Sequence, residues 1–288
     1  MRFIVASTLS VLSSVAIAEA SVAAEPEPTN VVDAEYAFAH SAKPLGVRGA
    51  FLKWLAADSI ICNPAPVNGV ASTAADEANA DTLEWYPTHS HTSGSDDLGY
   101  TTGPWTYRTA DGKTEAHGSF LSVWRKEPDN TWRVVLDCGV SHVKPEVAPT
   151  PLKRPSSGAS KAAVASWRDP IGTAEARFTA AATANSKAAL KSFGAADVRV
   201  MARGAPVAVG IEAGQTLLSG QKLGNVWGHV FAAQSSDGTF GYTWGYIGDA
   251  HSEAPTAAYV NIWQRTNANA PLKIVAQSLQ VLPPAKGR

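Results

Sequence analysis

The chain has 288 residues, of which 45% are hydrophobic and 17% charged, and its formal net charge is −1 at pH 7. This length allows one large domain or two ordinary ones, and the hydrophobic content can fill a core. Because the near-neutral charge comes without any run of Lys or Arg, the sequence argues against nucleic acid or an anionic membrane as a partner.

The first residues have the pattern of a secretory signal. A positive charge at Arg2 precedes an apolar stretch over residues 3–18, and small residues follow. "VAA" at 22–24 fits a signal-peptidase site, with "AEA" at 18–20 as the alternative site. A membrane anchor is the alternative interpretation, but the apolar stretch is short for a span. We therefore expect residues 1–24 to be removed, leaving a periplasmic or secreted protein without a membrane span.

Helical patterns come next. An Ala-rich stretch at 34–42 ends at Pro44 and Gly46, which break a helix. A second helix is predicted from an apolar stripe over residues 47–55, with spacing i, i+4, i+7, i+8. Strand patterns follow, with Gly, Asp and Asn at the turns. They are "SIIC" at 59–62, "TLEWYPTHSH" at 82–91, "LGYTTGPWTYR" at 98–108, "GSFLSVWRK" at 118–126 and "TWRVVLDC" at 131–138.

The second half of the chain repeats the first. "GYTTG" at 99–103 returns as "GYTWG" at 241–245, and four further blocks match in the same order. They are "AEYAF" at 34–38 with "AEARF" at 174–178, "AADSII" at 56–61 with "AADVRV" at 195–200, "FLSVWRK" at 120–126 with "YVNIWQR" at 259–265, and "WRVVLDC" at 132–138 with "LKIVAQS" at 272–278. Five ordered matches in only two copies predict a tandem duplication rather than a solenoid.

The duplication sets the predicted domains. The Pro- and Ser-rich segment 143–170 has no apolar period, so it is predicted to be a linker between domains at 25–142 and 171–288. Helices are expected at 174–183 and 187–193 of the second copy, as in the first. Helices followed by a run of antiparallel strands indicate an α+β fold, with the helices on one face of a curved sheet.

This order of elements, with "GYTTG" and "GSFLSVWRK…WRVVLD", resembles the nuclear transport factor 2-like superfamily. It is most similar to the SnoaL-like and ketosteroid-isomerase-like branch, which has many members of unknown function. The resemblance implies two tandem cone-shaped domains, in each of which the sheet wraps the helices and leaves an apolar pocket at its mouth. It also implies little about activity, because the superfamily includes isomerases, cyclases, dehydratases, binders and dimerisation modules.

An isomerase of this family needs two acids in each pocket. By the resemblance, the base would stand at Asn63, before Pro64, and the second acid near Ser122. In the second copy these places hold Ala202-Arg203 and Asn261. Because both acids are missing from both copies, we expect no isomerisation of the steroid type.

Other polar candidates are weaker. His89 and His91 are spaced to share one face of a strand and to bind a metal or ligand, although hydrogen-bonded strand residues are the commoner case. The shared parity with Trp85 predicts that this is the inner face. Asp137, in an otherwise apolar strand, is a candidate general base or a structural carboxylate. Glu35 and its counterpart at 175 either pair locally or reach the pocket. No cofactor motif is present.

The leading interpretation is an exported protein that binds a small, largely apolar molecule in an aromatic-lined pocket in each cone, without known catalysis. One alternative is a SnoaL-like enzyme acting on a small carbonyl or polyketide-like compound, with His89, His91 or Asp137 moving protons. The other is a dimerisation module, because sheet faces in this superfamily often pair, which also allows a homodimer. The candidate ligand-binding residues are Trp85, Trp105, Trp124, Asn63, Ser122, Trp227, Trp244, Asn261 and Trp263.

The two cysteines, Cys62 and Cys138, are the only ones in the chain. An exported chain meets an oxidising compartment, and the family's sheet places their two strands side by side, so a disulfide is expected. Two buried free thiols are the alternative. The second copy has Met201 and Ser278 at these places and cannot form the same bridge.

Overall fold

The computed structural model describes residues 27–144, 148–152, 170–250, 254–267 and 270–284. The predicted signal segment and most of the predicted linker lie outside these residues. Among the helices that the structure describes, none is both long and apolar enough to cross a membrane.

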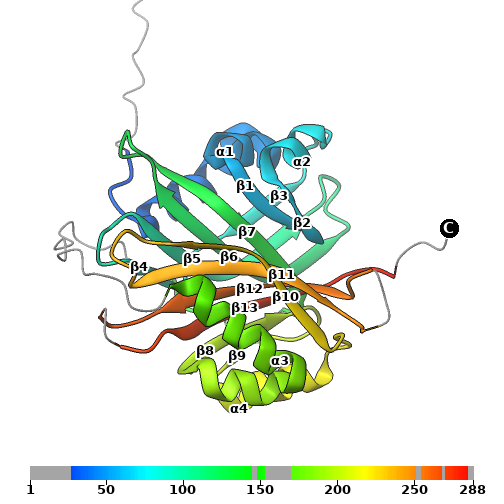
Figure 1. Cartoon of the computed structure of the whole chain (residues 1–288). Coiled ribbons are helices and arrows are strands. Elements are labelled where there is room, and N and C mark those ends of the chain that lie inside the picture. The colour runs from blue at the N-terminus through cyan, green and yellow to red at the C-terminus, as the bar shows by residue number, and fades with distance from the viewer. Residues whose placement is uncertain (1–26, 145–147, 153–169, 251–253, 268–269, 285–288) are drawn as a thin grey trace, which may run out of the picture.

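Two units of the same α+β plan follow one another along the chain (Figure 1). The first unit contains α1 (Val31–Trp54), β1 (Leu55–Asn63), β2 (Ala65–Asn68), α2 (Gly69–Ala75), β3 (Thr82–Trp85), β4 (His89–Thr92), β5 (Leu98–Arg108), β6 (Glu115–Lys126) and β7 (Trp132–His142). Its sheet has the order β2-β1-β7-β6-β5-β3, and β4 also pairs with β5. Strand β1 runs parallel to β7, and the other pairs are antiparallel.

The second unit repeats this order. It contains α3 (Ile171–Phe193), β8 (Gly194–Ala202), β9 (Ala208–Val209), α4 (Ile211–Gly220), β10 (Val226–Gln234), β11 (Phe240–Gly248), β12 (Ala257–Gln264) and β13 (Lys273–Val281). The sheet order is β10-β11-β12-β13-β8-β9, with β8 parallel to β13. The predicted fold class, two tandem units that each have a curved, mostly antiparallel sheet and N-terminal helices, is confirmed.

The first helix of each unit is broken in two, as the sequence predicts. In α1 the break is at Gly46, whose φ of 71° lies in the left-handed region that glycine tolerates. In α3 it is at Asn185, whose side chain then accepts hydrogen bonds from the N–H groups of Lys187 and Ala188 and so caps the second half. The short helices α2 and α4 are not among the elements that the sequence predicts.

The two sheets pack face to face, so that the order of layers is helices, sheet, sheet, helices (Figure 1). One buried apolar cluster joins the facing strands, with Leu121 and Leu136 from the first unit and Met201 and Ile262 from the second. The sheet faces that could pair between two chains are therefore occupied within one chain.

The hairpin tips before β5 and β11 fasten this face-to-face arrangement. The Asp97 carboxylate accepts hydrogen bonds from the backbone N–H and the hydroxyl of Ser236, while the Gly94 N–H donates to Thr239 Oγ1 at 3.1 Å. Burial alone would raise the pKa of Asp97, but hydrogen bonds from Ser236, Ser95 and other neighbours lower it. Each unit thus supplies a polar tip that completes the turn of the other.

The repeated pentapeptide has a structural reason at almost every position. A Cβ on Gly99 would lie 2.6 Å from the His91 carbonyl oxygen and 2.9 Å from Val31 Cγ1, and a Cβ on Gly241 would meet the equivalent atoms of Ala233 and Ile171. The tyrosine enters the cluster between the sheets, and the threonine points inward to a buried glutamate. The pentapeptide therefore marks where β5 and β11 pass under the first helix of their units.

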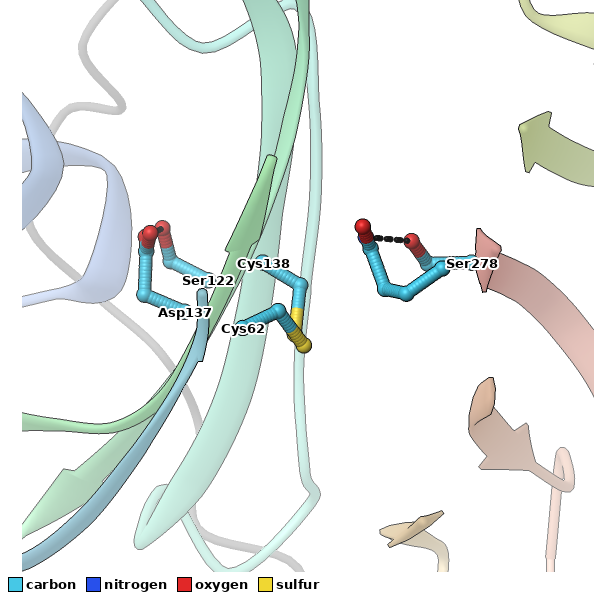
Figure 2. The surroundings of a disulfide bond; sticks show 6 residues. Cys62, Ser122, Asp137, Cys138 and Ser278 are labelled. Atoms are coloured by element: carbon cyan, nitrogen blue, oxygen red, sulfur yellow. Dashed lines mark hydrogen bonds between the residues drawn. A yellow bond between two sulfur atoms is a disulfide. The ribbon is translucent and has the colours of Figure 1, made fainter. Parts of the chain in front are cut away.

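A disulfide joins Cys62 of β1 to Cys138 of β7, with their Cα atoms 4.8 Å apart. Figure 2 shows it on the face of the first sheet that looks toward Ser278 of the second unit. At the equivalent place in the second unit, Met201 pairs with Ser278 in the parallel ladder without a covalent link. The second unit holds the same two strands by packing and backbone hydrogen bonds alone.

Reducing this disulfide is expected to destabilise the protein. The bond closes a loop with a sequence separation of 76 residues, which corresponds to about 4 kcal/mol in the chain-entropy model. The measurement is urea unfolding with and without reductant, with the Cys62→Ser/Cys138→Ser variant as a second comparison. Thiol titration of the unfolded, unreduced protein should find no free thiol, and two free thiols per chain would contradict the disulfide.

Candidate functional site

The interior of the first cone is organised around one buried carboxylate, Glu35 of α1. Its side chain is fully buried, and it accepts hydrogen bonds from Trp85 Nε1 at 2.6 Å and Trp124 Nε1 at 3.0 Å. The Thr101 hydroxyl of the repeated pentapeptide donates to it as well. Burial raises the pKa of Glu35, and these three donors oppose the rise. Glu35 is therefore a hub that fixes the two indoles, rather than a locally paired helix residue.

The second cone has the same hub at Glu175 of α3, which is also fully buried. It accepts from Trp263 Nε1 at 2.8 Å, from the Tyr259 hydroxyl at 2.8 Å and from Asn261 Nδ2 at 3.1 Å. Thr243 of the second pentapeptide completes the set. The two glutamates occupy the same position in the repeat because each accepts hydrogen bonds from the buried donors of its sheet.

The first cone contains a cavity of about 260 Å³ next to this hub. Phe38 and Phe51 of α1 form one wall, and β3, β5, β6 and β7 form the rest. The side chains that line it, apart from one carboxyl group, are apolar or aromatic: Phe38, Phe51, Leu83, Trp85, Trp105, Tyr107, Ala116 and Phe120. An apolar, partly open cavity of this size suits a small flat molecule.

Two glycines give the Trp105 indole its place in the cavity wall. A Cβ on Gly118 would collide with the indole ring, and a Cβ on Gly139 would lie 3.4 Å from its Nε1. In the second unit, strand order and register put Ala257 and Leu279 at these two positions. The first cone is thus kept open by residues that carry no side chain.

The single carboxyl group in the cavity wall is Asp137 of β7. Its Oδ2 accepts a hydrogen bond from Ser122 Oγ of β6 at 2.7 Å, directly across the strand pair (Figure 2). Burial raises the pKa of Asp137 to about 7, which the Ser122 hydrogen bond opposes and the nearby Glu35 charge reinforces. Near neutral pH this carboxyl group can therefore either donate or accept a proton at the cavity.

The second cone has larger side chains at the positions that border the first cavity. Gln277 replaces Asp137, and its Nε2 donates a hydrogen bond to Asn261 Oδ1 at 2.8 Å. Asn261 Nδ2 in turn donates to Glu175. Tyr259 and Leu279 are fully buried, and the Tyr259 ring packs 5.0 Å from that of Trp227. The expectation of an aromatic-lined pocket in each cone has support in the first cone, whereas in the second the counterparts of the cavity walls belong to a buried apolar cluster.

The structure places the candidate ligand-binding residues in different environments. Trp85 and Trp105 line the first cavity, whereas Trp124 and Ser122 are fully buried behind it. Asn63 is exposed at the end of β1 and is not among the lining residues. Trp244 packs between the two sheets, and three residues of the second copy belong to the interior of the filled cone: Trp227, Asn261 and Trp263.

His89 and His91 face the second unit and not the cone, contrary to the parity argument. Trp85 pairs with Trp105, and the same register would pair His89 with Thr101. His89 pairs instead with Thr102, so the register shifts by one residue between β3 and β4. A one-residue shift turns every following side chain to the other face of the sheet. The same shift occurs in the second copy, between His229 and Phe231. Within the described part of the chain, no three His, Cys, Asp or Glu side chains gather as a metal site.

Comparison with known proteins gives similarity in fold only. No family model and no curated protein matches the chain. Among solved structures, it is similar to an NTF-2-like protein of unknown function from Shewanella oneidensis (16% identity, 38% of this chain and 94% of that chain, TM-score 0.32). A ketosteroid isomerase-like protein from Erwinia carotovora gives 16% identity, 40% and 95% coverage and a TM-score of 0.31.

A nuclear transport factor 2-like superfamily protein from Salmonella enterica is similar to the same degree, with 16% identity, 41% and 92% coverage and a TM-score of 0.32. Each of these proteins covers about two fifths of the chain, which is the size of one unit. At such identities and TM-scores the likeness supports no inference about activity.

Replacing Asp137 with Asn is expected to stabilise the protein at about pH 8, by at least about 1 kcal/mol. The pKa of Asp137 is about 7 in the folded chain and about 3.9 when unfolded. The folded state therefore binds the proton more tightly, so the unfolding free energy of the wild type falls as pH rises between these values. Asp137→Asn removes this loss, because an amide stays neutral.

Urea unfolding at about pH 5 and about pH 8 measures the effect. Asp97→Asn is the matched control, because its carboxylate has a lowered pKa and its ionised form holds the hairpin tips together. That variant should lose stability at about pH 8. An Asp137→Asn protein that is less stable than the wild type at that pH would show that the Asp137 charge is favourably held.

Proposed function

We propose that the first unit binds a small, largely apolar molecule and that the second unit serves as its permanent packing partner. The observation that carries this proposal is the cavity of about 260 Å³ with aromatic walls and one carboxyl group, Asp137. The bound molecule would place its ring or chain against Trp85, Trp105 and Phe120, and one polar group against Asp137. Export to an oxidising compartment is part of the proposal, supported by the disulfide and by the signal-like N-terminal sequence.

A titrating carboxyl group decides which molecules fit. A protonated Asp137 donates to a carbonyl or ether oxygen, and an ionised one accepts from a hydroxyl or amine. A permanently anionic group would be repelled by Asp137 and by Glu35 behind it, because both lie in a low-dielectric interior without a cation nearby among the described residues. The expected ligand is therefore neutral, with a single hydrogen-bonding group.

Ligand binding should weaken when a side chain of the second cone is introduced into the cavity of the first. Gly139 of β7 corresponds to Leu279 of β13, so Gly139→Leu introduces the side chain found in the second cone. This variant should bind the neutral probe 2-naphthol about 10-fold more weakly, or weaker still. Leu279→Ala, the matched change in the second unit, should leave 2-naphthol affinity unchanged, because it does not touch the first cavity. Titration followed by tryptophan fluorescence measures both.

Native mass spectrometry of protein purified from its own host complements this test, because it looks for a retained molecule. Equal 2-naphthol affinity in the wild type and Gly139→Leu would place the binding elsewhere. Circular dichroism of Gly139→Leu confirms that the sheet is formed before its affinity is interpreted.

A second candidate function is an enzyme in which Asp137 moves a proton on the bound molecule. The specific observation in its favour is the pKa of about 7, which suits a general acid or base near neutral pH. Ser122 positions the carboxyl group from the neighbouring strand. A steroid-type isomerase stays excluded from the proposal, because Asn63 is an amide that is exposed at the strand end.

Asp137→Asn distinguishes the binder from the enzyme. If Asp137 is only a binding group, the variant should bind the retained ligand with altered affinity, and neither protein should convert it. If Asp137 is catalytic, conversion by the wild type should fall by about 100-fold or more in the variant while binding persists. Product analysis by mass spectrometry after prolonged incubation is the measurement, and conversion that is equal in both proteins would contradict a catalytic Asp137.

A further inference from the structure

A second cavity lies at the seam between the two units, on the side of the first sheet away from the cone. Its volume is about 520 Å³. The first unit contributes His89, His91 and Tyr100, and the second contributes side chains of β8, β12 and β13. Since neither unit forms this cavity alone, it exists only because the two sheets are packed together.

The walls of this seam cavity carry more positive than negative charge. Arg199, Arg265 and Lys273 line it, against the single carboxylate of Asp197. Arg265 is buried and donates from Nε to the Gly238 carbonyl oxygen, and Lys273 Nζ donates to the Ser192 carbonyl oxygen at 2.8 Å. Arg199, on β8, is half-buried and lines the cavity as well.

Arg199 lacks the partner that a half-buried guanidinium usually has. Within the described part of the chain it forms no ion pair, and its Nη2 contacts Nε2 of His89, which is itself a basic group. Burial lowers the pKa of both side chains, so His89 is the neutral acceptor in this contact. The remaining N–H groups of the guanidinium fork are left for a ligand.

The pseudo-equivalent place on the other side of the seam provides an internal comparison. There Arg125 is held by both oxygens of Asp58, at 2.9 Å each, and by Glu127 at 2.8 Å. Sequence and register match Asp58 to Asp197, but Arg125 to the neutral Gln264. One side of the seam is therefore a closed ion-pair network, whereas on the other side Arg199 forms no ion pair among the described residues.

We propose that the seam cavity is a binding site for a small organic carboxylate, whose two oxygens occupy the free edge of the Arg199 guanidinium. The planar fork of Arg matches a carboxylate with two parallel hydrogen bonds. The neutral His91 accepts from Gln264 Nε2 through Nδ1, at 3.2 Å, and so carries its proton on Nε2 as a further donor. Tyr100 and Val275 supply an apolar wall for the body of the ligand.

The same residues favour a single negative charge. Asp197 lies at the exposed rim of the cavity and repels a dianion such as phosphate more than a monoanion. This site is independent of the cone, whose carboxyl groups repel anions. A ligand with both an apolar part and a carboxylate would therefore bind in the seam cavity rather than in the cone, because of its charge.

Benzoate is the probe, and benzamide is its neutral counterpart of nearly the same shape. In a low-salt buffer without other carboxylates, calorimetric titration of the full-length mature protein should detect benzoate and not benzamide. Arg199→Gln should weaken benzoate by about 10-fold or more, because the fork is lost. Arg125→Gln is the matched control and should leave benzoate affinity unchanged, since that guanidinium is already occupied.

Arg199→Lys is a second variant, for the case that Arg199→Gln does not fold. It keeps a cation on β8 but removes the planar fork, so it should lose less benzoate affinity than Arg199→Gln. The proposal is overturned if benzamide binds as tightly as benzoate, if neither Arg199 variant weakens benzoate, if inorganic phosphate binds more tightly than benzoate, or if benzoate does not bind at millimolar concentrations. Gly139→Leu should leave benzoate binding intact, so failure at the seam is distinguishable from failure in the cone.

Discussion

A buried carboxylate bound by indole N–H groups is the interaction on which each cone depends. Glu35 and Glu175 bring a carboxyl group into the interior, which is costly unless several donors satisfy it. The donors come from strands far apart in sequence, including the threonine of each repeated pentapeptide and a tryptophan of β6 or β12. The hub therefore fixes the first helix of each unit against its sheet and sets how far the cone can close.

With the hub common to both units, the difference between them arises from a few inward positions. Asp137, Phe120 and Gly139 of the first cone correspond to Gln277, Tyr259 and Leu279 of the second. In the first unit a short carboxyl group and a glycine leave space beside the hub. In the second, longer side chains reach the hub or its neighbours and fill that space. The two copies have thus diverged beside the hub, where the first cone has a cavity and the second has larger buried side chains.

Much of the fold could be predicted from the sequence, because it depends on local patterns. The helix break at Gly46 follows from residue type, and the two-unit arrangement follows from the repeated sequence blocks. The orientation of His89 and His91 could not be predicted, because the one-residue register shift after Trp85 depends on pairing with β5. The sequence left the role of Glu35 open between local pairing and reaching the pocket, since its indole donors are 50 to 89 residues away in the sequence. Its recurrence as Glu175 was the one signal that could have revealed it.

The face-to-face packing of the units explains why the two copies were free to diverge. In a dimer of two identical chains, any substitution is present in both cones and on both sides of the seam. In a single chain with two copies, Asp137 and Gln277 can differ, and so can the environments of Arg199 and Arg125. The hairpin tips around Asp97 and Ser236 keep the two copies in a fixed relation, so residues from both can line one seam cavity. Covalent duplication therefore allows the interiors of the two cones to differ while side chains of both units line one seam cavity.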